Sequence, residues 1–168
     1  MSTGHKSKRG ERSGFTLLEL VLVMLIICTV LGAASASLRG FFVSRQTDDT
    51  AVRIVSLARL ARSMAVSEGR TYRLAFGRDG REFHLEAREQ GGFRRPRTGL
   101  GRTFEVPDEV SLELLLAEEE PDRDYLEFSP DGLTEPATVR LTDIKGDVIE
   151  VSCAGPTESF VITEPEDE

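Results

Sequence analysis

The side chains that most often carry catalysis or hold metal ions are sparse in this chain, which has only two histidines and two cysteines in 168 residues. His5 lies near the N-terminus, and His84 falls on the outward phase of a predicted strand, where we expect it at the surface. Cys28 and Cys153 lie far apart in different predicted elements, so we expect no intrachain disulfide. The serines lack a His–Asp pair that could activate them. The sequence therefore predicts no enzyme, no metal site and no cofactor.

Two acidic clusters, residues 117–124 and 164–168, contain oxygen ligands that a cation would accept. Neither cluster has the glycine-punctuated spacing of a calcium-binding loop. We favour solvated segments, and whether they bind calcium stays open.

Basic side chains gather in residues 88–102, which we expect to form a loop rich in glycine and arginine. Only Glu89 opposes them, and Phe93 lies among them; the arginines are Arg88, Arg94, Arg95, Arg97 and Arg102. Such a loop could contact phosphates of a nucleic acid, or it could form ion pairs with acidic neighbours. The chain has 21 Lys and Arg against 29 Asp and Glu, and its net charge is −8. This acidic balance argues against general nucleic-acid binding, so we favour the ion pairs.

Charge is distributed unevenly at the N-terminus. Residues 1–14 carry four basic side chains against one acidic, a sum of +3, which leaves −11 for the rest of the chain. Residues 15–38 contain one charged side chain, Glu19. As a helix, these residues would extend about 36 Å, which exceeds the ~30 Å hydrocarbon core of a bilayer. The segment shows no polar face, so it predicts a single membrane-spanning helix with its N-terminus in the cytoplasm.

Two features of this segment leave alternatives open. A cleavable secretory signal would also begin with basic residues, and the small residues 33–36 could form its cleavage site. The length of the apolar stretch and the presence of Glu19 count against that alternative. A carboxylate inside a membrane is costly and indicates a function, unless it lies at the level of the headgroups.

Residues 14–20, Gly-Phe-Thr-Leu-Leu-Glu-Leu, resemble the type IV prepilin signature. The resemblance implies that a prepilin peptidase cleaves between Gly14 and Phe15, and that the new N-terminus of Phe15 is methylated. Glu19 is then the fifth residue of the mature chain. The resemblance also implies that Glu19 sets the register of filament assembly, because the α-amino group of a neighbouring subunit can neutralise its carboxylate in an apolar filament core.

The remaining sequence predicts one long helix followed by a sheet domain. A helical stripe extends to Gly69, which we expect as its C-terminal cap. The stripe consists of Ala51, Ile54, Val55, Ala58, Ala61 and Ala65, widened by Val52, Leu57, Leu60 and Met64. Alternating segments then predict about seven to eight short strands near residues 72–76, 83–87, 104–106, 110–116, 125–128, 139–141, 148–151 and 160–162. Turns are expected at 77–80 and 129–132.

The predicted fold class is therefore α+β, with a long N-terminal helix and an antiparallel, pilin-like β domain. We expect the chain to be organised as a leader peptide (1–14), a transmembrane part of the helix (15–38), a periplasmic part of the helix (39–69), a β domain (70–163) and an acidic tail (164–168).

The helix-to-strand junction at residues 61–74 and the turn at 126–132 are similar to those of the GspH/FimT family, the H-class minor pseudopilins of type II secretion and related minor pilins. Residues 156–158, Pro-Thr-Glu, depart from the Thr-Gly often found there. The resemblance implies a structural subunit of the periplasmic pseudopilus near its tip, anchored in the bacterial inner membrane. Its implied partners are the prepilin peptidase, the major pseudopilin and other minor pseudopilins. The alternative is a minor type IV pilin of pilus biogenesis or DNA uptake, with DNA contact through residues 88–102.

Overall fold

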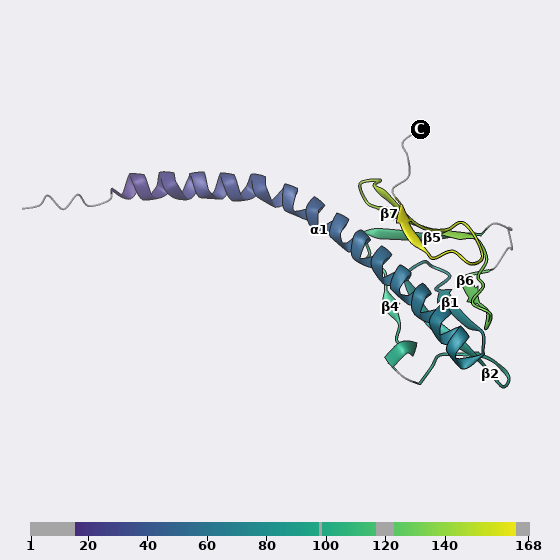
Figure 1. Ribbon diagram of the computed structural model, residues 1–168. Helices are drawn as coiled ribbons and strands as arrows, with labels where there is room; N and C mark the ends of the chain where they lie inside the picture. Colours follow the sequence, from purple (N-terminus) through teal and green to yellow (C-terminus); the bar gives the residue numbers. More distant parts are fainter. Residues whose placement is uncertain (1–15, 98, 117–122, 164–168) are drawn as a thin grey trace, which may run out of the picture. The chain divides into compact units, whose positions relative to one another are not determined.

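The computed structural model describes residues 16–97, 99–116 and 123–163, without the side chains of 33–43 and 100. The chain divides into two units, Met1–Arg39 and Gly40–Glu168. Helix α1 (Leu17–Glu68) begins in the first unit and ends in the second (Figure 1). The predicted leader with Gly14 and Phe15, the acidic tail 164–168, and most of the acidic cluster 117–124 lie outside the described residues.

The second unit contains two antiparallel sheets. One has the order β3-β2-β1-β6, with β4 also pairing with β2, and the other has the order β5-β7-β8-β9. The strands are β1 (Tyr72–Phe76), β2 (Glu82–Glu89), β3 (Gly92–Arg94), β4 (Phe104–Glu105), β5 (Val110–Leu116), β6 (Tyr125–Phe128), β7 (Ala137–Asp143), β8 (Val148–Cys153) and β9 (Val161–Thr163). A 3-10 helix, η1 (Gly99–Gly101), precedes β4. The predicted α+β class with antiparallel sheets is confirmed.

The end of α1 and the first hairpin form where glycine permits a left-handed backbone. Gly69 follows the last helical residue with a φ of 64°, which is the conformation of a helix C-cap. Gly80 has a φ of 67°, and its N–H donates to the carbonyl of Gly77 at 2.8 Å. This turn joins β1 to β2 in a register that places Leu74 opposite Leu85. The predicted cap and hairpin are confirmed.

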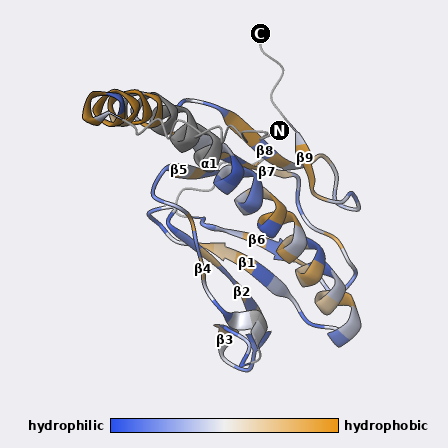
Figure 2. Ribbon diagram, turned by 90° about the vertical axis from the view of Figure 1, so that its left-hand side faces the viewer, coloured by the Kyte–Doolittle hydropathy of each residue, from blue (hydrophilic) through white to orange (hydrophobic). Residues whose placement is uncertain are grey.

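The core of the second unit lies between the C-terminal half of α1 and the sheets (Figure 2). All six residues of the predicted helical stripe are buried. Alanines at 58, 61 and 65 leave room for large sheet residues such as Phe83 and Phe128, which are fully buried. Val52 is 53% exposed, so its assignment to the buried face was wrong. It lies one position beyond Ala51, about 100° around the helix, and that rotation points it to solvent.

The described residues contain nine strands, one more than the upper prediction, and the extra strand corrects the picture of residues 88–102 as one loop. Strand β2 continues to Glu89, and Gly92–Arg94 returns as β3, with Arg88 opposite Phe93. Gly91 and Gly92 have positive φ values, and they allow the tight reversal between the two strands. The segment was assigned to a loop because its glycine content and short strand gave no alternating pattern.

Candidate functional site

The first turn of α1 positions the carboxylate that the sequence singled out. The N–H of Glu19 donates to Oγ1 of Thr16 at 3.2 Å, and the N–H of Leu20 donates to the carbonyl of Thr16 at 3.2 Å. Thr16 is therefore the N-cap of the helix, with Glu19 at its third position. The residue is exposed at the positive end of the helix dipole, where a carboxylate is stabilised. The neighbouring Gly14 and Phe15 lie outside the described residues.

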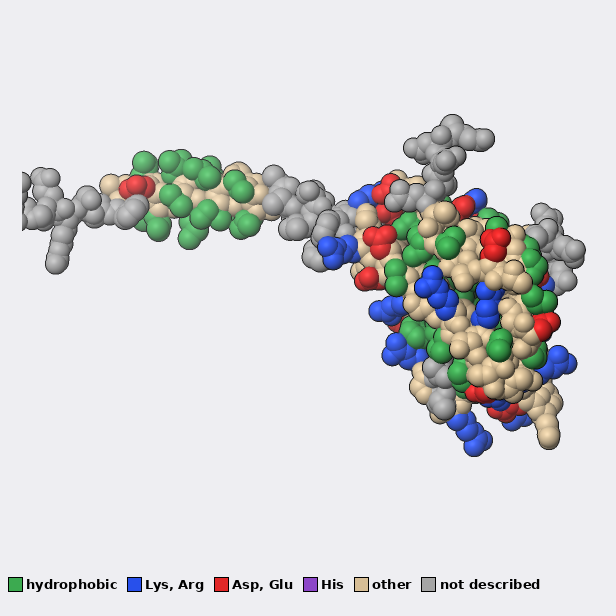
Figure 3. Space-filling view, viewed as in Figure 1, with side chains coloured by type: hydrophobic (Ala, Val, Ile, Leu, Met, Phe, Trp, Pro, Cys, Tyr) green, Lys and Arg blue, Asp and Glu red, His purple; other side chains and the backbone are tan. Residues whose placement is uncertain are grey.

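The helix after Glu19 is apolar on every side. Between Leu17 and Leu31 the large hydrophobic side chains of α1 are all exposed, from 79% at Leu17 to 44% at Val23 and 64% at Leu31. Figure 3 shows hydrophobic side chains along this part of α1 on the face in view. Among the residues described, no helix combines the length and hydropathy of a membrane span. The predicted span 15–38 includes Phe15, which is outside the described residues, and 33–38, whose side chains are not described.

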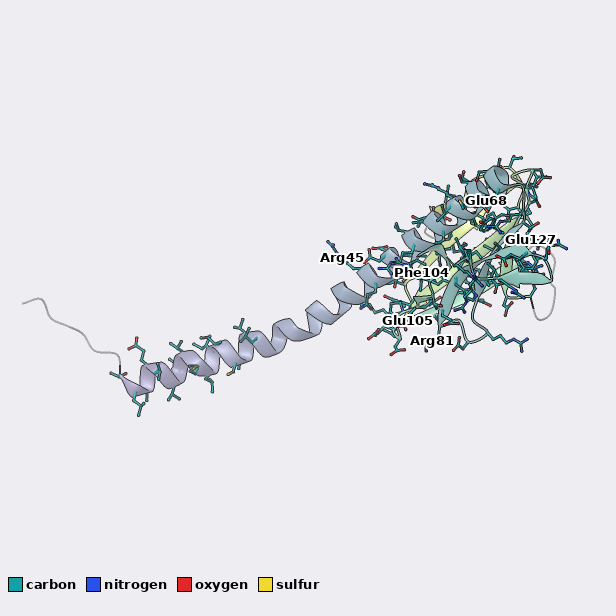
Figure 4. All side chains as sticks on the ribbon, turned by 90° about the horizontal axis from the view of Figure 1, so that it is seen from below. Arg45, Glu68, Arg81, Phe104, Glu105 and Glu127 are labelled. Carbon is teal, nitrogen blue, oxygen red and sulfur yellow. The ribbon has the colours of Figure 1, made fainter. Side chains whose placement is uncertain are left out.

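The five arginines predicted as one basic loop have different environments. Arg88 lies over the ring of Phe93, with 5.8 Å from its guanidinium carbon to the ring centroid, and Arg102 lies 4.3 Å from the centroid of Phe104. Arg95 donates to Oγ1 of Thr103 at 2.9 Å. Arg94 and Arg97 are exposed. Figure 4 labels Phe104 next to Glu105 and Arg81, at the edge where β4 meets β2. Three of the five arginines are therefore held against side chains of the domain.

His84 is buried, which corrects the expectation of a surface histidine. It is 8% exposed, although it lies on the face of β2 opposite Phe83 and Leu85. Its Nε2 is 3.3 Å from Oε1 of Glu86, and its Nδ1 accepts from Arg95 at 3.3 Å. The alternation along β2 does not predict this environment, because Arg95 comes from residues 88–102, which were expected to form a loop.

A stack of arginines and aromatic rings on the same face was not predicted from the sequence. The guanidinium carbon of Arg73 lies 3.5 Å from the ring centroid of Phe93 and 3.8 Å from that of Tyr125. Arg73 also pairs with Glu127 at 2.9 Å, and Arg123 lies 4.7 Å from the centroid of Tyr125. These residues belong to β1, β3 and β6 and the segment before β6. The alternation along each strand predicts that its member of this stack points outward. Which of these residues contact one another depends on the order of the strands in the sheet.

A second polar cluster closes the end of α1. The hydroxyl of Tyr72 donates to Oε2 of Glu68 at 2.9 Å and accepts from Nη2 of Arg70 at 3.0 Å. Arg70 also donates from Nε to Glu68 at 2.6 Å. Burial, followed by the hydrogen bond to the Glu68 carboxylate, raises the pKa of Tyr72 above its ordinary value. The cluster anchors the C-terminus of the helix to β1.

Within the described residues, these polar groups come together as ion pairs, hydrogen bonds and cation–π contacts. Each cluster belongs to the second unit, and the carboxylate of Glu19 lies on the part of α1 that belongs to the first unit. Such an arrangement suits recognition and packing between chains.

Comparisons with known proteins agree with this architecture. The family model described as type II transport protein GspH matches residues 50–155, and the model of the prokaryotic N-terminal methylation motif matches residues 9–35. Over 66 residues the chain is 39% identical to the type II secretion system protein H of Pseudomonas aeruginosa. That match covers 39% of this chain and only 38% of the relative's length.

Solved structures share the fold. The minor pseudopilin EpsH from the type 2 secretion system of Vibrio cholerae superposes with a TM-score of 0.60 at 13% identity, over 73% of this chain and 99% of that one. The type IV minor pilin FimU of Pseudomonas aeruginosa superposes with a TM-score of 0.54 at 16% identity, over 74% of this chain and 92% of that one. At these identities the similarity concerns the fold alone.

Proposed function

This chain belongs to the type II transport protein GspH family, and from that premise we propose that it is a minor pseudopilin, a structural subunit of a type II secretion pseudopilus. The observation that carries the proposal is the presence on one chain of a GspH-type β domain and an N-terminal methylation motif. In this role the β domain recognises other subunits, and the apolar helix anchors the subunit and packs in the filament.

The order of events follows from the N-terminal residues. The precursor inserts into the inner membrane with the basic residues 1–14 in the cytoplasm and the β domain in the periplasm. The prepilin peptidase cleaves between Gly14 and Phe15, and Phe15 is methylated. Cleavage leaves Thr16 as the second residue, where it caps the helix through the N–H of Glu19.

Assembly then uses the carboxylate of Glu19. The subunit leaves the bilayer and enters a filament with the major pseudopilin and other minor pseudopilins, near the tip. The α-amino group of an adjacent subunit neutralises Glu19 in the apolar core, since an unpaired carboxylate there would be strongly unfavourable. A subunit at the extreme tip has one fewer such contact, so its dependence on Glu19 is smaller.

Secretion and co-purification test the proposal. In the source cells, deletion of the gene should stop release of type II substrates, and the tagged protein should co-purify with the other pseudopilins. Loss of pili or of DNA uptake, with normal secretion, would instead support a minor type IV pilin. The exposed Arg94 and Arg97 are the residues that such a pilin would offer to DNA. A gel shift that the double variant Arg94→Gln, Arg97→Gln abolishes would favour that second function.

A further inference from the structure

A groove of about 490 Å³ lies beside α1 in the second unit. Its lining includes the apolar Ala58, Val66 and Phe160 and the polar Arg59, Arg62 and Ser63. Phe160 is 2% exposed, whereas Val66 is 54% exposed. Side chains of Lys and Arg lie over and beside this half of α1 in Figure 3. The groove therefore combines an apolar floor with a basic rim.

Arg62 has hydrogen-bonding capacity that the fold does not use. Its Nη1 donates to the carbonyl of Thr157 at 3.4 Å, which is a long hydrogen bond. Its Nε and Nη2 are buried and have no hydrogen-bond partner. Leaving such donors unsatisfied is unfavourable, most of all on a charged group. Nε and Nη2 form one edge of the guanidinium, and that edge matches the two oxygens of a carboxylate.

The helix side of the groove has the opposite charge to the chain as a whole. Residues 53–67 contain three arginines and no acidic residue, in a protein with a net charge of −8. Within the described residues, Arg59 and Arg62 form no salt bridge, and both line the groove. Two guanidinium groups three positions apart on a helix repel each other. An anion between them would relieve that repulsion and satisfy Arg62.

We propose that this groove binds an acidic segment of a neighbouring subunit, with one carboxylate between the guanidinium groups of Arg59 and Arg62 and an adjacent apolar side chain against Phe160 and Val66. The identity of the partner as a pilin-type subunit rests on the proposed function. The carboxylate chemistry rests on the groove itself. A free phosphate or a nucleic acid would occupy the basic rim but would leave the apolar floor uncovered.

A zero-length carbodiimide coupling tests the groove in the full-length protein in detergent. The variant Arg62→Lys keeps the positive charge and supplies an amine that couples fastest to a carboxylate held beside it. Arg53→Lys, on the same helix and outside the groove lining, is the matched control. The exposed Lys145 reports coupling in solution. The probes are the peptides ALEELA and AGEEGA, with both termini blocked, and mass spectrometry locates the coupled lysine.

We expect ALEELA to couple at position 62 about tenfold faster than at position 53 or at Lys145, because the groove holds the peptide's carboxylate beside the lysine amine. AGEEGA should couple more slowly at position 62, because it has glycines in place of the leucines that would pack against the apolar floor of the groove. Equal rates at positions 62 and 53 would overturn the proposal, as would equal coupling of both peptides at position 62. An unfolding temperature equal to that of the unaltered protein shows that Arg62→Lys is folded. If Arg62→Lys does not fold, the same comparison is made with Arg59→Lys.

Coupling in cells that assemble the filament tests the partner separately. The Arg62→Lys variant should yield a crosslink from position 62 to an Asp or Glu of another pilin-type subunit, and Arg53→Lys should not. A crosslink to a protein of another class would refute the partner while the peptide result still supports the groove. Normal secretion after gene deletion would refute the proposed function and leave the peptide experiment valid.

Discussion

Helix α1 has opposite environments in the two units of this chain. In the second unit its alanines face a core and are buried, with Ala51, Ala61 and Ala65 at 0% exposure. In the first unit the leucines and isoleucines are larger, and those between Leu17 and Leu31 are all exposed. The same secondary structure therefore serves two purposes. One part holds a domain together within the chain, and the other presents apolar surface, which the proposed function would bury in a membrane or against other subunits.

The two parts of α1 gain the free energy of apolar burial from different sources. Burying a Leu or Ile side chain contributes roughly 1.5–3 kcal/mol, and the second unit gains this from its own sheets. In the first unit, the same gain requires insertion or assembly. We therefore expect substitutions in the second unit to change the folding stability of the monomer, and substitutions in the first unit to change its association.

The largest effect should come from opening the core of the β domain. Phe128 is fully buried and packs edge-to-face on Phe160, with 6.2 Å between the ring centroids. Phe128→Ala should reduce the free energy of unfolding by about 3–5 kcal/mol. Leu25, at 61% exposure, is the matched control, and Leu25→Ala should leave that free energy unchanged. Hydrogen exchange of the strands in the full-length protein in detergent measures both values. Equal destabilisation by the two variants would contradict the division between the units.

The next effect concerns assembly and should leave folding untouched. Glu19→Ala removes a carboxylate from the first turn, and membrane insertion and cleavage should continue. Removing one partner of a buried ion pair costs about 3–5 kcal/mol, because the other charge stays unpaired. Co-purification with the other pseudopilins should therefore fall by at least about tenfold. Co-purification at the native level, with normal secretion, would exclude an assembly role for Glu19.

A smaller effect is expected at the arginine–aromatic stack, which sharpens the picture of the β domain as a self-contained unit. Arg73→Gln loses two ring contacts and the pair with Glu127. Together these should cost about 1–2 kcal/mol. Arg94→Gln, on β3 at the end of the same sheet, should change stability by less than about 0.5 kcal/mol. Chemical denaturation followed by circular dichroism compares the two. A stability loss as large for Arg94→Gln would show that the stack has no special role.

The smallest effect is at the C-terminus of α1, where Tyr72→Phe removes one hydroxyl and leaves Glu68 paired with Arg70. We expect a loss of about 1 kcal/mol at neutral pH. The folded state raises the pKa of Tyr72, so the native protein releases this proton at higher pH than the unfolded chain. The stabilisation is therefore complete below the ordinary value near 10 and decreases as the pH rises above it. Denaturation experiments between pH 8 and pH 11, a range about the ordinary pKa of tyrosine, give the free energy of unfolding at each pH. This free energy should decrease more steeply with pH for the unaltered protein than for Tyr72→Phe.

Local patterns were sufficient to predict most of the fold. The helical stripe, the cap at Gly69 and the hairpin at residues 77–80 depend on neighbours within a few positions, and each is confirmed. Strand β3 was missed because three residues, the first of them a glycine, carry no periodic signal. Val52 was misplaced because one residue separates the buried and exposed faces of a helix.

Prediction of the surface sites was less complete, because those sites depend on strand order. His84 is buried by Arg95, and Arg73 lies between rings from two other strands. Neither contact follows from spacing along the chain. The carboxylate of Glu19 was identified from its motif, and its cap by Thr16 is a local contact that the residue types explain.

The mass of the mature protein tests the central claim most directly. The full-length chain is expressed in membranes together with a prepilin peptidase, purified and measured intact by mass spectrometry. We predict the loss of residues 1–14 and the gain of one methyl group on Phe15, and a full-length precursor when Gly14 is replaced by a bulky residue. Cleavage near Ala36, or an unprocessed N-terminus in the presence of an active peptidase, would contradict the account of this chain as a pseudopilin.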